Sequence, residues 1–301
     1  MKIAQVIDDL ISYERGEADV KELNNEKSIG ELTKLGHETK RDKFLYGQKH
    51  LNEECTGIVT TCWATANVIE QAHQQGANLI ISHEALFWNH GDKTNWLIQN
   101  NNKTFLKKKK LLDKYGIVVR RDHDHIHSGI PVQESPDGWA DGIFYGYAQE
   151  LGWTKYMKNF HGVPFCFEFP KGMTARKIGH HLITTFGLNG CRIEGNLNTS
   201  VRKAIIPMHN LGDAKELITY IDQNQIDCVL AMEMIDFTLA EYIRDSSMLG
   251  LNKSIVQIGH FNTEEAGMKY MVKWLPSAIR NDNIPISFIQ SGDMYHFIAE
   301  S

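Results

Sequence analysis

The amino-acid sequence predicts an α/β fold with two mixed or parallel α/β layers. Apolar, strand-like runs alternate with segments of helical spacing, and the alternation begins near Gly57 and starts again near His161. Strands that alternate with helices form parallel sheets covered by helices. The 301 residues are enough for two domains. We expect both chain ends, residues 1–155 together with 252–301, to form the main domain and residues 156–251 to form an inserted second α/β domain.

The first half of the chain contains one alternating series after an amphipathic helix start at Met1 to Leu10. The expected elements are a strand over Gly57–Trp63, a helix over Thr65–Gln75 ended by Gly76, a strand over Ala77–Ser82, a helix over Asn95–Tyr115 closed by Gly116, and a strand over Ile117–Arg120. Residues Asp122–Gly138 break this pattern with His, Gly and Pro, and helical spacing resumes over Trp139–Leu151.

The second half repeats the pattern. We expect strands over Val163–Phe169, Val201–Pro207, Cys228–Met232, Ser254–Ile258 and Pro285–Gln290, with helices near Thr174–Phe186, from about Gly212, near Phe237–Leu249 and from Thr263.

Composition excludes several classes of protein. The formal net charge of -5 and the pI near 6.3 give no basic footprint for nucleic acid. No apolar run approaches the roughly 18 residues that span a bilayer, and the start does not resemble a secretory signal. The five cysteines are scattered, without a C-x-x-C pair, so a metal site would have to rely on His and carboxylates. We therefore expect a soluble, cytoplasmic protein that has no membrane partner.

One basic run, Lys107 to Lys110, lies within the expected helix over Asn95–Tyr115. Its main interpretation is a solvated helix surface, because the apolar residues of the same segment can supply a buried face. A patch for an anionic ligand or partner is the alternative.

Ligand-type residues follow three of the expected strands, and parallel sheets bind ligands beyond the carboxyl ends of their strands. The three sets are His83 and Glu84 after the first, the run Asp122, His123, Asp124, His125 and His127 after the second, and His260 and Glu264 after the third. Five ionisable groups within six positions are costly to crowd together unless a cation or a hydrogen-bond network compensates them. We expect the three strand ends to share one sheet edge and to hold two divalent ions about 3.5–4 Å apart. The alternative is that these residues are only hydrogen-bonded.

The motifs resemble the NIF-three-like (NGG-one-interacting factor three) dinuclear metal-centre family, whose members are often labelled GTP cyclohydrolase 1 type 2 homologues. The family reads G-A-D-L-I-I-S-H-H-P-L where Gly76–Leu86 read GANLIISHEAL, and G-H-x-x-(S/T)-E where Gly259–Glu264 read GHFNTE. Its H-T-N-L-D motif aligns with His123–His127, HDHIH, and weaker echoes occur at Gly138–Gly152 and Ile286–Asp293. Residues from about 160 to 250 match poorly.

The resemblance implies a ligand set. One ion would be held by His83, His127 and Glu264, and the other by Glu84, His260 and Glu264 as bridge, with His123 as a further ligand or a supporting residue. The family's second His is Glu84 here and its Asp is His127, so one His and one carboxylate have exchanged places and the ligand inventory is kept. A shifted alignment would instead use Asp122 or Asp124. His90 and Asp92 could support the site, but a surface turn over Asn89–Asp92 is the preferred interpretation.

The resemblance further implies a metal-dependent hydrolase that opens a purine nucleotide ring, with a metal-bridged hydroxide as nucleophile. Zn, Fe, Mn, Co or Ni would suit such a centre, and a homo-hexamer with a nucleotide or other small-molecule substrate is the implied assembly. The other hypothesis is a non-catalytic metal-binding scaffold or regulatory interaction protein.

Overall fold

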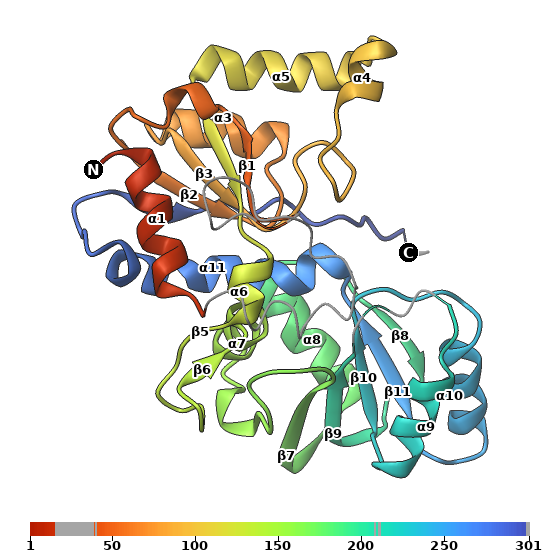
Figure 1. Cartoon of the computed structure of the whole chain (residues 1–301). Helices are drawn as coiled ribbons and strands as arrows, with labels where there is room; N and C mark the ends of the chain where they lie inside the picture. The colour runs from red at the N-terminus through yellow and green to blue at the C-terminus, as the bar shows by residue number, and fades with distance from the viewer. Residues whose placement is uncertain (16–38, 40, 208, 210–211, 299–301) are drawn as a thin grey trace. The chain divides into compact units, whose positions relative to one another are not determined.

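The computed structural model describes residues 1–15, 39, 41–207, 209 and 212–298, and divides the chain into two compact units. The first unit comprises residues 1–146 and 267–291, and the second comprises residues 147–266 and 292–301. Both contain a five-stranded sheet with helices (Figure 1). The expected mixed α/β fold is confirmed.

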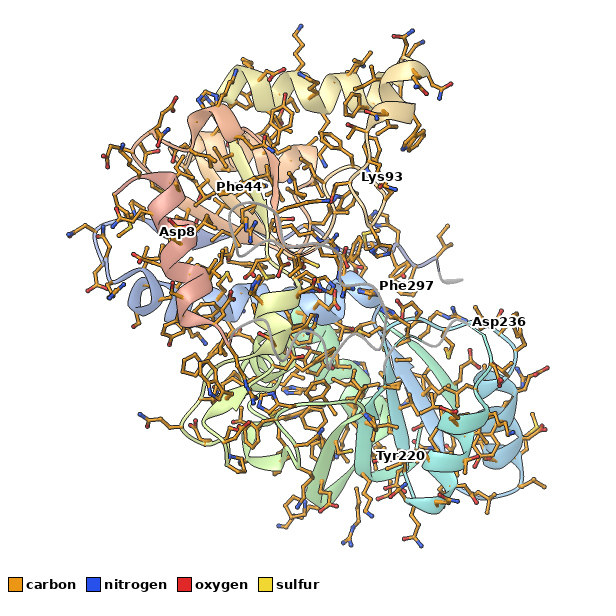
Figure 2. All side chains as sticks on the ribbon, in the orientation of Figure 1. Asp8, Phe44, Lys93, Tyr220, Asp236 and Phe297 are labelled. Atoms are coloured by element: carbon orange, nitrogen blue, oxygen red, sulfur yellow. The ribbon has the colours of Figure 1, made fainter. Side chains whose placement is uncertain are left out.

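The sheet of the first unit has the strand order β1-β4-β3-β2-β12. Its strands are β1 (Phe44–Tyr46), β2 (Ile58–Thr61), β3 (Leu79–Ser82), β4 (Val118–Arg121) and β12 (Ile286–Phe288). Four of them run parallel, and β1 is an antiparallel edge strand on β4. The sequence pattern missed β1, which carries Phe44 (Figure 2). Phe44 pairs with Arg120, and its ring lies 5.3 Å from the guanidinium carbon.

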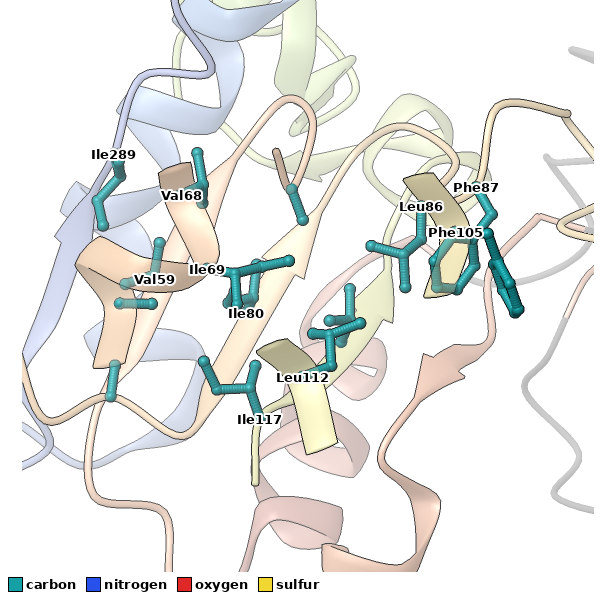
Figure 3. Close-up of a cluster of buried hydrophobic side chains, with 14 of the residues drawn as sticks. Val59, Val68, Ile69, Ile80, Leu86, Phe87, Phe105, Leu112, Ile117 and Ile289 are labelled. Carbon is teal, nitrogen blue, oxygen red and sulfur yellow. The ribbon is translucent and has the colours of Figure 1, made fainter. Parts of the chain in front are cut away.

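Several helices lie wholly or partly in the first unit. They are α1 (Ile3–Tyr13), α3 (Ala66–Gln74), α4 (Asn95–Gln99), α5 (Lys103–Tyr115), α6 (Asp124–Ser128), α7 (Gly142–Glu150) and α11 (His260–Ile279), and short pieces η1 (Gln48–His50), β5 (Ile130–Pro131) and β6 (Trp139–Ala140) complete the unit. The first unit holds α7 up to Gly146 and α11 from Gly267. Val59, Ile80 and Val119 pack against α3 and α5 in one apolar cluster (Figure 3).

Side-chain caps explain where α3 and α5 begin. Thr65 accepts a hydrogen bond from the Val68 amide at the start of α3, at 3.1 Å. The expected single helix over Asn95–Tyr115 is two helices, because Asn101 adopts a left-handed φ of 48° and Asn102 caps α5 by accepting from the Phe105 amide.

The sheet of the second unit has the order β7-β9-β10-β11-β8. Its elements are η2 (Thr154–Tyr156), β7 (Phe165–Thr174), α8 (Ala175–Phe186), β8 (Arg192–Gly195), β9 (Ser200–Ile206), α9 (Lys215–Gln223), β10 (Cys228–Ala231), α10 (Leu239–Met248) and β11 (Ser254–Gln257). The central strands are parallel, whereas β7 and β8 are antiparallel edge strands. Side chains from α9 and α10 pack on one face of the sheet, and Gly179 of α8 approaches Ile193 and Val256.

The expectation that three strand ends share one sheet edge is wrong. Strands β3 and β4 are neighbours in the first sheet, but β11 pairs with β10 in the second. The compact units accordingly divide the chain at 146/147 and 266/267, where the sequence suggested 155/156 and 251/252. Residues 292–301 also belong to the second unit, in which Asp293 accepts hydrogen bonds from the Asn189 amide and the Asn262 side chain.

No helix among the described residues is long and apolar enough to cross a membrane.

Candidate metal-binding sites

The backbone just beyond β3 carries His83 and Glu84. The His83 and Glu84 amides donate to the carbonyls of Thr61 and Cys62, at 3.2 and 2.7 Å, so the pairing with the β2 segment continues past the end of the strand. Both side chains are buried, with exposed fractions of 0% and 4%. The backbone pairing and the burial therefore hold these two residues in place.

The middle motif forms the short helix α6, and Asp42 holds its first turn. The Asp42 carboxylate accepts hydrogen bonds from the amides of His123, Asp124 and His125, at 2.6, 2.9 and 2.7 Å. It also lies 2.5 Å from His125 Nδ1. Because residues four apart lie on one helix face, His123 and His127 project together, whereas His125 is taken by Asp42. Sequence reasoning missed Asp42, which precedes the site by about 80 positions.

His83, His123 and His127 form the three-histidine cluster. Their candidate ligand atoms all lie within 4.8 Å of one another, and the ring centroids are 4.5 to 5.0 Å apart. Each Nδ1 has an oxygen partner: the Asp122 carbonyl for His83, Asp124 for His123 and Asp141 for His127, at 3.0, 3.2 and 2.8 Å. An Nδ1–H that donates in this way leaves the lone pair on Nε2, which is the tautomer that binds metals.

The surroundings of His123 favour its neutral imidazole. Burial, together with the neighbouring His83 and His127, lowers the pKa of His123 well below its usual value of 6.5. A metal ligand must be the neutral form, so the cluster holds His123 in the state that a cation requires.

Glu84 lies against a guanidinium. Arg121, which is fully buried, places Nη2 2.9 Å from Glu84 Oε2 and donates from Nε to the His83 carbonyl at 3.0 Å. Its Nη1 donates to the His90 carbonyl at 2.9 Å. Arg121 thus holds the loop after β3, and Glu84 already neutralises a buried cation.

The two aspartates of the shifted alignment face other groups. Asp124 pairs with Arg41 at 2.6 Å and accepts from Thr39. Asp122 is buried beside Asp42 and Glu14, and this burial and the Asp42 charge raise its pKa to about 6. Among the described residues, the group that unites His83 with the middle motif contains His123 and His127 and neither of these carboxylates.

The turn expected over Asn89–Asp92 is confirmed. The Asp92 amide donates to the Asn89 carbonyl at 2.9 Å, and the Asp92 carboxylate accepts from the amides of Leu86 and Phe87. Asp92 therefore shapes the loop that follows Glu84.

The second unit contains another candidate group, the Glu233 cluster of His209, Glu233 and His260. The Glu233 carboxylate forms hydrogen bonds with Nδ1 of His209, at 2.9 Å, and with Nδ1 of His260. His260 Nε2 lies 2.9 Å from Glu264, one helical turn further on. A cavity of about 340 Å³ opens beside this cluster, lined in part by Arg192, Gln257 and Tyr295.

Helix α11 begins three residues earlier than expected. His260 is its first residue, so Glu264 meets His260 by i,i+4 spacing and does not point back from a first turn. Near the start of α11 the Asn262 side chain donates to the Ile258 carbonyl, and the Thr263 hydroxyl donates to that of Gly259.

Charges in the Glu233 cluster reinforce one another. Burial raises the pKa of Glu233, but hydrogen bonds from His209 and His260 outweigh it and bring the value to about 2. Burial lowers the pKa of His260, but Glu264 and Glu233 outweigh it and raise the value to about 11. A cation at His260 would therefore have to displace a proton.

Sequence reasoning also missed His209 and Glu233. Glu233 stands two residues after β10, and His209 stands three residues after β9. The strand-end rule could have found both, since the expected strands were placed correctly. No sequence motif surrounds His209.

Fold and site together define an α/β protein with a candidate metal-binding group in each of two units. A model of the Duf34/NIF3 (NGG1p interacting factor 3) family matches residues 130–293, more than half of the chain, and the chain belongs to this family. The match runs through residues 156–251, where the motifs correspond poorly.

Known relatives agree with this assignment. The chain is 24% identical over 220 residues to the GTP cyclohydrolase 1 type 2 homolog of Clostridium perfringens (strain 13 / Type A). The matched region covers 69% of this chain and 73% of that protein. A Bacillus cereus protein related to NIF3 superposes with a TM-score of 0.66 at 15% identity, over 99% of both chains. A Staphylococcus aureus hypothetical protein superposes with a TM-score of 0.65 at 16% identity, again over 99% of both chains. At these identities the two structures establish the fold alone.

Proposed function

We propose that the protein is a metal-dependent hydrolase of the GTP cyclohydrolase 1 type 2 homolog kind, which binds two divalent ions per chain. The observation that carries the proposal is the three-histidine cluster, in which every Nδ1 faces an oxygen acceptor and the candidate ligand atoms gather within 4.8 Å. This donor set fits a divalent transition metal, because imidazole nitrogen oriented by a carbonyl or carboxylate is a preferred ligand.

The chain's own residues have distinct roles in this proposal. His83, His123 and His127 would hold one ion, and His260 and Glu264 would supply ligands for another, with His209 and Glu233 beside them. Asp141 orients His127, and Glu233 orients His260. A bound divalent ion lowers the pKa of water and so supplies a hydroxide nucleophile near neutral pH. The name of the Clostridium perfringens relative supports a purine nucleotide as the substrate.

Metal content tests the first part of this proposal. Protein purified without chelator should contain close to two ions of Zn, Fe, Mn, Co or Ni per chain by inductively coupled plasma mass spectrometry, and His127→Ala should remove about one of them. His90→Ala is the matched control, since His90 is an exposed histidine outside the three-histidine cluster. Fewer than about half an ion per chain, unchanged in His127→Ala, would contradict metal binding.

Turnover tests the second part. Metal-loaded protein should consume GTP, with the product followed by liquid chromatography, and His127→Ala should lower the rate by at least about a hundredfold while His90→Ala leaves it unchanged. Metal binding without turnover of any nucleotide would refute the hydrolase.

A non-catalytic scaffold is the second candidate, and the Glu84–Arg121 ion pair favours it. Glu84 stands where the family pattern has its second His, and its Oε2 lies 2.9 Å from a buried guanidinium. A carboxylate that neutralises Arg121 is a weaker metal ligand than a histidine at the same position. The scaffold would bind metal through the three-histidine cluster and show no turnover. A homo-hexamer remains a prediction of the family resemblance, and light scattering after gel filtration tests it.

A further inference from the structure

The first unit contains a pocket that has no role in the proposed metal chemistry. It has a volume of about 500 Å³, within the range of small-molecule sites, and is bounded by the start of α3, the outer face of α5 and the segments that follow β2 and β3. The described residues that line it include no His, Asp, Glu or Cys. The pocket therefore has ligand-binding features that do not depend on the candidate metal ligands.

Two indoles form part of its wall. Trp63 follows β2 by two residues and Trp88 follows β3 by six, so both belong to loops at the carboxyl edge of the parallel sheet. Trp88 is 41% exposed and has a φ of 62°. A bulky residue held in the left-handed region is strained, and such strain concentrates at ligand-binding sites.

Three lysines of α5 supply the positive charge. Lys103 and Lys107 line the pocket, and neither forms an ion pair with another described residue. Lys103 is also the first residue of the helix, whose amino end favours a negative group. Because the lining carries ammonium groups and no carboxylate, its potential attracts anions.

Lys108 is the buried member of this set, with an exposed fraction of 5%. Its Nζ donates to the Leu86 carbonyl at 2.7 Å and lies 5.4 Å from the Trp63 ring centroid and 5.8 Å from that of Trp88. Within the described chain this carbonyl is its only hydrogen-bond acceptor, although an ammonium group has three donors. Burial lowers the pKa of Lys108 to about 7, which Asp92 partly opposes, so a nearby anion would stabilise the charged form.

We propose that this pocket binds a small anion that carries an aromatic ring, with the ring against Trp63 and Trp88 and the anionic group at Lys103 and Lys107. An aryl carboxylate and a nucleoside monophosphate share this chemistry. The sequence already singled out the basic run for an anionic ligand or a solvated surface, and the burial of Lys108 excludes a wholly solvated run.

Binding of four probes tests the proposal by calorimetry at about pH 6.5, where Lys108 is largely protonated. The probes are 2-naphthoate, guanosine monophosphate, neutral 2-naphthol and inorganic phosphate. We expect 2-naphthoate, the nucleotide or both to bind at least about tenfold more tightly than 2-naphthol and phosphate. The tighter of the first two identifies the source of the ligand. Absence of binding by both up to about 5 mM, or equal binding of a probe that lacks the ring or the charge, would overturn the proposal.

Matched variants locate the site. Trp88→Ala and Lys107→Gln should each weaken binding about tenfold. Trp96→Ala and Lys110→Gln should change it less than about twofold, because these exposed residues of α4 and α5 do not line the pocket. Lys103→Gln provides a third substitution should Trp88→Ala fail to fold. Equal losses in the variants and their controls would refute this location.

Discussion

The three-histidine cluster and the Glu233 cluster hold imidazoles in different ways. In the first, each histidine has its own oxygen partner, drawn from separate residues: the Asp122 carbonyl, Asp124 and Asp141. In the second, the single carboxylate of Glu233 receives both histidines. The first arrangement keeps His123 neutral, whereas the second holds His260 as a cation. Burial beside His83 and His127 disfavours the charge on His123, whereas the carboxylates of Glu264 and Glu233 favour the charge on His260, a difference that a list of ligand residues does not reveal.

The largest expected effect comes from removing the guanidinium of Arg121, which contacts Glu84 and the His83 carbonyl. Arg121→Met removes the buried guanidinium 2.9 Å from the buried carboxylate of Glu84, so the free energy of unfolding should fall by about 3–5 kcal/mol. Urea denaturation measures the loss, and hydrogen exchange should place it in the first unit. Arg192→Met is the control, because its partner Asp236 is 84% exposed (Figure 2) and the change should stay within about 0.5 kcal/mol. Equal losses in both variants would show that the buried pair contributes no more than a surface pair.

The carboxylates that hydrogen-bond the histidines differ between the two clusters, and substitutions at these carboxylates test the difference. Asp141→Asn removes a charged acceptor from His127 alone, while Glu233→Gln weakens the acceptor of both His209 and His260. Zinc affinity, measured against a competing chelator, should fall about 10-fold in Asp141→Asn and nearer 100-fold in Glu233→Gln. The reverse order would contradict the idea that one carboxylate organises the whole Glu233 cluster.

A pH-dependent difference is expected at Lys108. Its pKa is about 7 in the folded protein and 10.5 in its ordinary state, so the folded protein disfavours the charged amine. Stability is therefore lowest below about pH 7 and rises as the pH increases toward 10.5. Lys108→Met should raise the melting temperature by roughly 2–4 °C near pH 6.5, and this gain should shrink to nothing near pH 10. A gain that is independent of pH would show that desolvation of the amine is not its cause.

The smallest expected effect comes from removing one helix cap in each unit. Asn102 accepts from the Phe105 amide at 3.0 Å in the first unit, and Thr174 accepts from the Lys177 amide at 3.2 Å in the second. Asn102→Ala and Thr174→Ala should each lower the free energy of unfolding by about 1 kcal/mol, as chemical denaturation would show. A loss below about 0.3 kcal/mol in either would mean that backbone or solvent replaces that cap.

Most elements were predictable because their signals are local. Leu79–Ser82 is an apolar run between Gly76 and a polar segment, and it forms β3. Ala66–Gln74 follows the cap Thr65, and it forms α3. The edge strands β1 and β8 were not predicted, because strands of three and four residues that are partly exposed carry little periodicity.

The candidate site was predicted in part. His83, His123 and His127 were named from the sequence, and the structure gathers them. Asp42 was not assigned to it, because Asp42 acts through amides that are about 80 positions further along the chain. His209 and Glu233 were not assigned to a site either, although both stand just beyond predicted strands. The burial of Lys108 was likewise hidden, since its neighbours Lys107 and Lys110 are exposed and a charge run indicates solvent.

The sequence by itself determined the α/β class, the family and the identity of the ligand-type residues, because periodicity and short motifs are properties of neighbouring positions. Only the tertiary structure decided that β11 joins the second sheet, that Glu84 faces Arg121 and that one carboxylate receives two histidines. Those outcomes depend on strand pairing and on which charges are buried together, and both are set by contacts between residues far apart in the chain.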